Sequence, residues 1–452
     1  DAPISEAGWT TEKFFLLRDL LKNYLPAGES LPEVPAALPV IEIPEIHFNK
    51  VAPLFSNLPE TKQTVDIQPM EQFNQGWGTI LYRTTLPEAT PAGTVLKITE
   101  VHDWAQIYAD GKLLARLDRR KGEFTTTLPA LKKGTQLDIL VEAMGRVNFD
   151  KSIHDRKGIT EKVELVSGNQ AKELKNWTVY NFPVDYSFIK DKKYNDTKIL
   201  PSMPAYYKST FKLDKVGDTF LDMSTWGKGM VWVNGHAMGR FWEIGPQQTL
   251  FMPGCWLKEG ENEILVLELK GPAKASIKGL KKPILDMLRE KAPETHRKDG
   301  EKLKLAGEKV IHEGAFTPGN GWQEVRFAAP VKGRYFCLEA LSPQANDNIA
   351  AVAEFDVLGA DGKPVSREHW KIRYADSEET RSGNRTADKI FDLQESTFWM
   401  TVDNVPYPHQ LVIDLSKVET VTGFRYLPRA EKEYPGMIKE YRVYVKSADF
   451  NY

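Results

Sequence analysis

The sequence predicts a mostly β protein made of several β-sandwiches and preceded by a single helix. First, short runs such as TILYRTTL and EILVLELK alternate apolar and polar residues and are bounded by Gly, Asn or Asp, as strands are. Second, a set of these runs occurs twice in the same order. Third, helical periodicity after the first helix returns only at KPILDMLREK, near position 285. A chain of 452 residues has room for about three such domains.

The segment TTEKFFLLRDLLKNYL near the N-terminus is typical of an amphipathic helix. Thr10 or Thr11 can cap its first turn, and the spacing of its large residues predicts one apolar stripe. The stripe consists of Phe14, Leu17, Leu21 and Tyr24. A short helix of this kind is stable when its apolar face packs against another element. The next stretch, however, residues 26–50, is rich in proline and is predicted to be an extended linker.

The internal repeat predicts two related sandwiches. Each copy contains a dipeptide, Asp110-Gly111 or Asn234-Gly235, that suits the two-residue turn of a β-hairpin. The matching pieces are LYRTTL (81–86) with YYKSTF (206–211), AQIYADGKLLARL with MVWVNGHAMGRF, and LKKGTQLDILVE (131–142) with LKEGENEILVLE (257–268). We expect the first sandwich, with its linking segments, within residues 51–199. We expect the second within residues 200–270, completed by strands from residues 40–70.

Composition and charge exclude several classes of function. The formal net charge is −2 and basic residues are spread along the chain, whereas a nucleic-acid surface requires a clustered basic field. No apolar run approaches the roughly 20 residues of a membrane span. The two cysteines, Cys255 and Cys337, have no metal-ligand spacing and are predicted to be buried free thiols.

Several separated motifs resemble the β-galactosidases of glycoside hydrolase family 35. They are GWGTILYRTTLP, VEAMGRVNFD, and PAYYKSTF followed by MVWVNGHAMGRFWEIGPQQTLFMP, and the resemblance covers roughly residues 1–270. In that family a (β/α)₈ barrel is followed by two jelly-roll, galactose-binding-like sandwiches. The resemblance therefore implies that residues 1–25 are the last helix of a barrel that this sequence does not contain. The parent enzyme would be a retaining, exo-acting β-galactosidase.

The resemblance also implies which residues take part in the chemistry. The two glutamates of a retaining glycosidase come from barrel strands in this family, so we expect no catalytic residue in this chain and no cofactor for catalysis. The MGRVNFD loop lies toward the barrel mouth in the family. Arg146 would anchor this loop, and Asn148 and Phe149 would form a wall beside the substrate. For Arg240 and Trp242, bracing of the second sandwich is expected rather than contact with substrate.

Residues 301–452, after a linker at 271–300, resemble a discoidin module, also called coagulation factor type C or family 32 carbohydrate-binding. The matching pieces are DLQESTFWMT, YPHQLVIDLS, FRYLPR and IKEYRVYV. The strands that usually close this module, GWQEVRFAAPVKGRYFCLEAL and AVAEFDVLG, come first here. We therefore expect a circularly permuted module. The alternative is two truncated half-modules, which would leave open sheet edges.

Two kinds of site are expected in this module. The loop DLQEST corresponds to a segment that often binds structural Ca²⁺ in the family, which makes Asp392, Thr397 and Glu354 candidate ligands, although the usual Asp-Gly-Asp pattern is broken. Both a calcium site and a metal-free loop stay open on the sequence. The candidates for binding carbohydrate are Tyr407, Arg429, Glu431 and Tyr434, and a purely bracing role for the module is the alternative.

Two functions are compatible with these features. The chain can be the non-catalytic C-terminal region of an exo-acting β-galactosidase, which supports the barrel and binds β-galactoside-containing glycans. Alternatively it can be a freestanding carbohydrate-binding protein or adhesin. The helix favours the first, because an exposed apolar stripe would be an aggregation liability for a freestanding lectin. The resemblance alone implies an exported protein, in the periplasm, at the cell surface or secreted.

Overall fold

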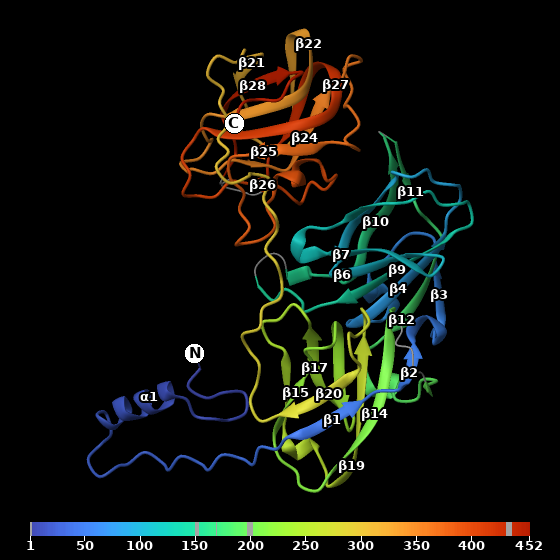
Figure 1. The fold of residues 1–452 in the computed structure, drawn as a ribbon, viewed down its shortest axis with the longest axis vertical. Coiled ribbons are helices and arrows are strands. Elements are labelled where there is room, and N and C mark those ends of the chain that lie inside the picture. The colour runs from blue at the N-terminus through green and yellow to red at the C-terminus, as the bar shows by residue number, and fades with distance from the viewer. Residues whose placement is uncertain (1, 150–152, 169, 197–201, 431–435) are drawn as a thin grey trace. The chain divides into compact units, whose positions relative to one another are not determined.

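The computed structural model describes residues 1–452 except 1, 150–152, 169, 197–201 and 431–435. The chain forms two compact units (Figure 1). Residues 1–59 and 183–291 make up one unit, and residues 60–182 and 292–452 make up the other. Strands dominate both units, which confirms the predicted fold class.

The first sandwich lies in residues 60–182 and consists of a six-stranded and a four-stranded sheet. The six-stranded sheet has the order β3 (Thr61–Thr64), β12 (Trp177–Phe182), β4 (Gly78–Thr85), β9 (Gln136–Ala143), β6 (Trp104–Ala109) and β7 (Lys112–Asp118). The four-stranded sheet has the order β11 (Gln170–Glu173), β10 (Gly158–Ser167), β5 (Val95–His102) and β8 (Thr125–Thr127). Two 3₁₀ turns, η2 (Met70–Phe73) and η3 (Arg119–Lys121), connect these strands. Tyr82 and Trp177 are fully buried in the core between the sheets.

The second sandwich repeats this plan. Its six-stranded sheet has the order β13 (Asn195–Asp196), β2 (Lys50–Pro53), β14 (Ala205–Leu213), β19 (Gly260–Glu268), β16 (Lys228–Val233) and β17 (His236–Trp242). Its four-stranded sheet has the order β1 (Ile43–His47), β20 (Ser276–Leu280), β15 (Thr219–Asp222) and β18 (Thr249–Met252). The short helices of this part are α2 (Tyr186–Ile189), η1 (Leu54–Ser56) and η5 (Gly254–Trp256).

The two sandwiches confirm the repeat that the sequence predicts. The order β4-β9-β6-β7 in one sheet corresponds to β14-β19-β16-β17 in the other, and these strands contain the matched sequence pieces. The hairpin dipeptides have the positive φ angles that their turn requires, 45° and 78° at Asp110-Gly111 and 49° and 88° at Asn234-Gly235. From residues 40–70, β1 and β2 pair within the second sandwich, whereas β3 pairs within the first.

Some boundaries differ from those expected. The linker range 271–300 contains β20, a central strand of the second sandwich, and the linker range 26–50 contains β1. The KPILDMLREK segment is not helical. It runs alongside residues 244–248 instead, where the Gln248 amide donates to the Ile284 carbonyl at 2.9 Å. Cys337 is buried as expected, but Cys255 is exposed, because it lies in the η5 turn rather than in a strand.

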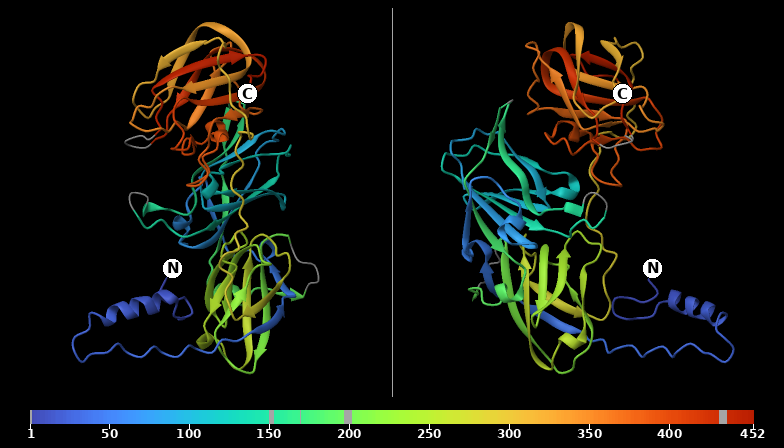
Figure 2. Two further views of the ribbon diagram at one scale, coloured as in Figure 1. Left: turned by 60° about the vertical axis from the view of Figure 1, so that its left-hand side comes forward. Right: turned by 180° about the vertical axis from the view of Figure 1, so that it is seen from behind.

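The last domain is one sandwich, not two half-modules. The early strands β21 (His312–Ala315), β22 (Gln323–Ala340) and β24 (Glu354–Leu358) share a sheet with the late strands β27 (His409–Leu427) and β28 (Glu440–Lys446), in the order β21-β28-β22-β27-β24. The remaining elements are β25 (Lys371–Ala375), which pairs with β27, the pair β23 (Ala351–Val352) and β26 (Trp399–Met400), and η6 (Ala387–Phe391). Yellow-orange and red strands lie side by side in this domain in Figures 1 and 2.

The ends of this domain also lie together, as a permuted module requires. Lys304 pairs with Asn451 in an isolated bridge, and the Ile311 amide donates to the Val443 carbonyl at 2.8 Å. The strand pairing and these contacts are those expected of a circular permutation. Two half-modules would have left the early and late strands in separate sheets.

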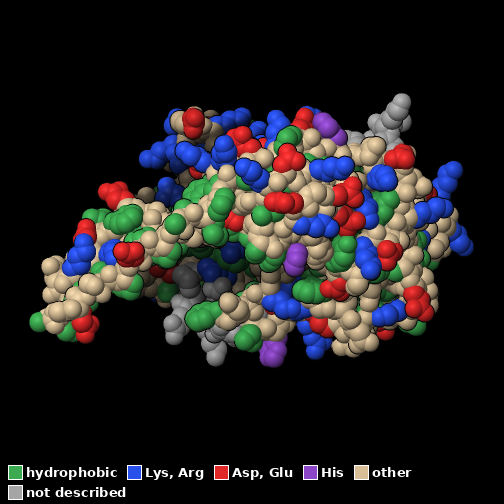
Figure 3. Space-filling model, turned by 90° about the horizontal axis from the view of Figure 1, so that it is seen from below, with side chains coloured by type: hydrophobic (Ala, Val, Ile, Leu, Met, Phe, Trp, Pro, Cys, Tyr) green, Lys and Arg blue, Asp and Glu red, His purple; other side chains and the backbone are tan. Residues whose placement is uncertain are grey.

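The predicted N-terminal helix is α1 (Glu12–Lys22), with Thr11 at the N-cap position. The Thr11 hydroxyl does not cap the helix, because it donates to the Pro3 carbonyl at 3.0 Å. None of the residues of α1 is buried, and Leu16 and Leu21 are 64% and 53% exposed. Figure 3 shows hydrophobic side chains, in green, along the arm at its left. The apolar face of α1 is therefore open within the described part of this chain.

Candidate functional sites

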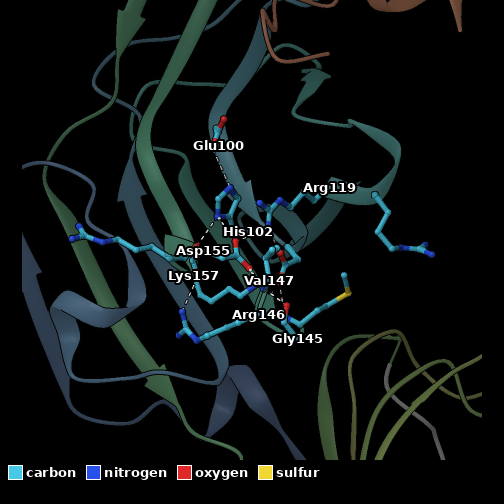
Figure 4. Close-up of polar contacts among 12 residues, drawn as sticks. Glu100, His102, Arg119, Gly145, Arg146, Val147, Asp155 and Lys157 are labelled. Atoms are coloured by element: carbon cyan, nitrogen blue, oxygen red, sulfur yellow. Dashed lines mark hydrogen bonds and ion pairs between the residues drawn. The ribbon is translucent and has the colours of Figure 1, made fainter. Parts of the chain in front are cut away.

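A buried network of ion pairs holds one end of the first sandwich (Figure 4). Its centre is Lys157, whose side chain is completely buried just before β10. The Lys157 ammonium donates to Asp103 and Asp155, both at 2.7 Å, and to the Gly145 carbonyl at 3.0 Å. All three ammonium protons therefore have acceptors, as a buried charge requires. Arg119 adds a second cation, with its Nη1 atom 2.8 Å from Asp103 and 2.7 Å from Asp155.

The same network contains an imidazole with acceptors at both ring nitrogens. His102 Nδ1 lies 2.5 Å from the Arg156 carbonyl, and Nε2 lies 3.1 Å from Glu100. Burial opposes ionisation of Asp155, but hydrogen bonds from Lys157 and Arg119 lower its pKa to about 2. The Asp155 carboxyl group is therefore charged at neutral pH.

The network fixes the MGRVNFD loop. The Val147 amide donates to Asp155 at 3.1 Å, and Arg146 donates to the Asp155 and Gly76 carbonyls, each at 2.7 Å. These hydrogen bonds tie Arg146 to the two segments that contain residues 76 and 155. Asn148 and Phe149 project beyond it and are exposed, Phe149 by 80%.

Trp77 is a further member of this rim that the sequence analysis missed. It follows Gly76, to which Arg146 is bound, and is 57% exposed. Val147 and Ile153 are also exposed, by 38% and 60%. We call Trp77, Val147, Phe149 and Ile153 the apolar rim. No spacing in the sequence connects Trp77 with a loop about 70 residues later, so only the fold could reveal it.

The candidate calcium ligands lie together in the last domain, at the end of η6. The Thr397 hydroxyl donates to Asp392 at 2.8 Å, and the Gln394 amide donates to the same carboxylate at 3.0 Å. Glu354, at the start of β24, is close enough for the Asp392 charge to raise its pKa, in addition to the larger effect of burial. Burial likewise raises the pKa of Asp392.

The set of ligands is nevertheless small. In the described ranges of the chain no group of three or more His, Cys, Asp and Glu side chains is arranged to hold a metal. Arg367 already forms an ion pair with one oxygen of Glu354. The other oxygen, Oε1, is buried and accepts no hydrogen bond from the residues that the structure describes.

The four candidates for binding carbohydrate are only partly placed. Arg429 follows β27, with its guanidinium 4.4 Å from the Phe398 ring centroid and its Nη1 atom 3.4 Å from Met400 Sδ. Tyr407 is half-buried against the core, and its hydroxyl donates to the Ile349 carbonyl at 2.5 Å, so its first role is packing. Glu431 and Tyr434 lie outside the described residues.

A buried histidine orders the loop beside Tyr407. His409 Nδ1 lies 2.7 Å from Asp376, and Nε2 lies 2.7 Å from the Asn348 carbonyl. Both ring nitrogens therefore lie within hydrogen-bonding distance of an oxygen atom. Asp347, in the same loop, accepts from the Gly436 amide at 3.1 Å. Sequence reasoning missed this arrangement because its members are distant in the chain.

Arg240 and Trp242 lie on β17 of the second sandwich. Trp242 is half-buried, and the buried Lys228 ammonium lies 3.9 Å from the centroid of its ring. This contact across two paired strands is in keeping with the expected bracing role.

Comparison with known families agrees with this division of the chain. Residues 68–183 match the family model described as "Beta-galactosidase, first all-beta domain", and residues 204–262 match "Beta-galactosidase, galactose-binding domain". Residues 374–452 match "F5/8 type C domain". The chain therefore contains two regions that match β domains of β-galactosidases, followed by a region that matches a discoidin-type domain.

Relatives are found among β-galactosidases of several organisms. The chain is 33% identical to "Beta-galactosidase" of Bos taurus over 66% of its own length and 49% of the relative's. It is 32% identical to "Beta-galactosidase 1" of Dictyostelium discoideum (59% and 44%) and 34% identical to "Beta-galactosidase" of Xanthomonas manihotis (56% and 40%). The chain spans less than half the length of each of these relatives.

The alignment with the solved structure of a Pleurotus ostreatus lectin covers 53% of this chain and 81% of the lectin, at 11% sequence identity. Its TM-score is 0.17, which is too low to support an argument about the fold. Among the described residues, no helix is long and apolar enough to cross a membrane.

We predict that Lys157→Met lowers the free energy of unfolding of the first sandwich by about 3–5 kcal/mol, because it removes the fully buried cation from two buried carboxylates and leaves them only the partly exposed Arg119. Denaturant unfolding measures this change. Lys162→Met is the matched control on β10, since Lys162 is 44% exposed and pairs with Glu164 at the surface. The control should cost less than about 1 kcal/mol. Equal losses for both variants would contradict the structural importance of the network.

We also predict that docking of residues 292–302 onto the last domain weakens as the pH rises. His296 Nδ1 lies 2.8 Å from the buried Glu378. Burial opposes the charged form of His296, but the hydrogen bond and charge of Glu378 raise its pKa above 6.5. The stabilisation is therefore complete below pH 6.5 and is lost as the pH passes the raised pKa.

Hydrogen exchange of these residues, corrected for intrinsic rates, should show protection falling between about pH 6 and pH 8. In the His296→Gln variant the protection should be independent of pH. Protection that increases with pH in the unaltered chain would show that the ion pair does not hold this segment.

Proposed function

We propose that this chain is the non-catalytic region of an exported, exo-acting β-galactosidase. In this proposal α1 and the apolar rim support a (β/α)₈ barrel that supplies the catalytic carboxylates, and the discoidin-type domain binds glycans containing β-galactosides. The observation that carries the proposal is the open apolar face of α1, which buries no residue in this chain. The two β-galactosidase domain matches name the class of enzyme.

The geometry of the rim supports the same proposal. Large apolar side chains at the end of a sandwich are normally covered, and exposed groups of them mark interaction surfaces. Here Phe149 and Trp77 are held outward by Arg146 and by the network around Lys157. A rigid apolar rim of this kind suits the wall of a site that receives a sugar and the group attached to it.

We predict that the double variant Leu17→Asp, Leu21→Asp does not change the unfolding midpoint of this chain, because neither side chain is buried here. In a longer chain that contains the barrel, the same double variant should lower stability by several kcal/mol, because each change places a charge in an apolar contact. Lys13→Glu, off the apolar stripe, is the control. Thermal unfolding measures the stability of each chain, and turnover of an aryl β-galactoside measures its activity.

This chain alone should not hydrolyse the aryl β-galactoside, and the longer chain should. If the double variant changes the stability of neither this chain nor the longer chain, α1 does not pack on the barrel, and a freestanding glycan-binding protein is favoured. Turnover by this chain alone, well above a buffer blank, would also contradict the proposal.

The discoidin-type domain should bind β-galactosides through Arg429. We predict that Arg429→Ala weakens the binding of methyl β-D-galactopyranoside by about tenfold or more, as expected when a charged hydrogen-bond donor is removed from a site. Calorimetric or NMR titration measures the affinity. Arg381→Ala, in another exposed loop of the same domain, should leave it unchanged. If the Arg429 variant binds the galactoside as tightly as the unaltered chain, the surface around Tyr407 and Arg429 is not the binding site.

Calcium is a further proposal for this domain. The site offers the carboxylates of Asp392 and Glu354 and the hydroxyl of Thr397, all oxygen donors that Ca²⁺ prefers. A buried Glu354 oxygen without a hydrogen-bond donor among the described residues fits such a cation, and burial has raised the pKa of both carboxyls. Bound there, Ca²⁺ would supply the positive charge that keeps both groups ionised and would hold η6 against β24.

We predict that Ca²⁺ binds with one equivalent per chain and raises the unfolding temperature. Stabilisation should reach about 2.7 kcal/mol when free Ca²⁺ is about 100 times its dissociation constant. Asp392→Asn should abolish both effects. Asp361→Asn, at an exposed position in the same domain, should retain them. Absence of a calcium-dependent shift in the unaltered chain would exclude the site.

A further inference from the structure

Trp322 is an exposed tryptophan that polar groups fix at the surface. It ends the loop before β22, and 36% of it is exposed. Its indole N–H donates to Glu395 at 3.3 Å, and the Arg425 guanidinium lies 4.6 Å from the ring centroid. An exposed ring that only fills space would not need an edge contact and a face contact with charged groups. These contacts give the indole a fixed orientation at the surface.

A row of charged side chains lies beside this ring. The strand register pairs Arg425 on β27 with Glu324 on β22 and with Asp356 on β24. Directly paired residues point to the same face of a sheet, so the three side chains form one row. Their neighbours Phe424 and Phe355 belong to the core, which places the row on the outer face.

The row is itself held in place. Arg425 Nε lies 2.9 Å from Asp356, and Arg367 binds the other oxygen of Asp356 at 2.9 Å. The guanidinium of Arg425 therefore cannot swing away from Trp322 without losing its ion pair. Glu324 and Glu395 are exposed. Glu395 accepts from the Trp322 indole, and Glu324 accepts from Arg326 at 2.7 Å.

We propose that Trp322 is the stacking platform of a second carbohydrate site, which takes a single hexose residue of a glycan on the outer face of β22, β27 and β24. A pyranose ring presents an apolar C–H face, which suits an exposed indole, and a rim of hydroxyls, which suits carboxylates and a guanidinium at its edge. The proposal rests on glycan binding by this domain. It concerns other residues than Tyr407 and Arg429, the candidates for the site in the proposed function.

The test uses the whole chain and lactose as the probe. The indole N–H resonance of Trp322, assigned by its loss in Trp322→Phe, should shift saturably during the titration. Trp322→Ala has no such resonance, so its affinity for lactose is measured by calorimetric titration in the Arg429→Ala background, where it should be about tenfold lower than with Trp322 present, in line with the loss of one aromatic contact and its buried area. Trp77→Ala, which removes an exposed tryptophan from another domain, should leave the Trp322 shift unchanged.

Arg429→Ala separates this inference from the proposed function. If Trp322 still responds in that variant, its site does not depend on Arg429 and the inference stands, whatever the outcome for the proposed Arg429 site. If saturating lactose leaves the Trp322 resonance unmoved, the inference is overturned, whether or not an Arg429-dependent response remains. A Trp322 response that disappears in Arg429→Ala also overturns it, because a single site at the Arg429 rim would then account for both.

Discussion

One buried ammonium group determines how the end of the first sandwich that carries the apolar rim is built. The Lys157 side chain is buried at the point where β10 begins, and two carboxylates and a carbonyl take its three protons. Asp103 lies between β5 and β6, and Asp155 lies in the long loop after β9. The ion pairs therefore tie segments of both sheets to the MGRVNFD loop, and the exposed apolar rim can be rigid because its base is charged and enclosed.

In the second sandwich, a buried carboxyl group instead of an ammonium group holds the strand ends together. Glu268, at the end of β19, is fully buried and accepts hydrogen bonds from backbone amides, including those of Gly227 and Lys270 at 2.8 and 2.7 Å. Burial raises the pKa of Glu268, and these amides act in the opposite direction. Two copies of one sandwich thus share their apolar strands but differ in the polar groups at the strand ends. The copy with the cationic network is the one that carries the exposed rim.

Periodic features could be predicted from the sequence, whereas contacts between distant loops could not. The repeat located β4, β9, β14 and β19, because alternation and turn dipeptides are local signals. β20 lies in a segment that reads as a lysine- and proline-rich linker, and it forms a strand because β1 and β15 hydrogen-bond to it from either side. Tertiary pairing therefore overrode a weak local signal.

The candidate sites show the same limit. Arg146 could be predicted as an anchor because a family motif contains it, and the calcium candidates came together as expected because the permuted strand order is correct. The prediction that Cys255 is buried was wrong because its exposure depends on the η5 turn. Trp77 and Trp322 were missed since a tryptophan in a sequence usually indicates core, and only the fold shows which ones are held at the surface.

The permutation has a physical basis in the central strand pair of the last domain. β22 and β27 are 18 and 19 residues long and pair along most of their length. Because β28 and β24 each add to one side of this pair, the sandwich is defined by pairing and not by the order in which the chain supplies its strands. The match to the F5/8 type C family covers only residues 374–452, while β21, β22 and β24 come before it. Glu354 and Asp392 illustrate the result: they lie in opposite halves of the permuted sequence, yet one pairing scheme brings their carboxylates within electrostatic range.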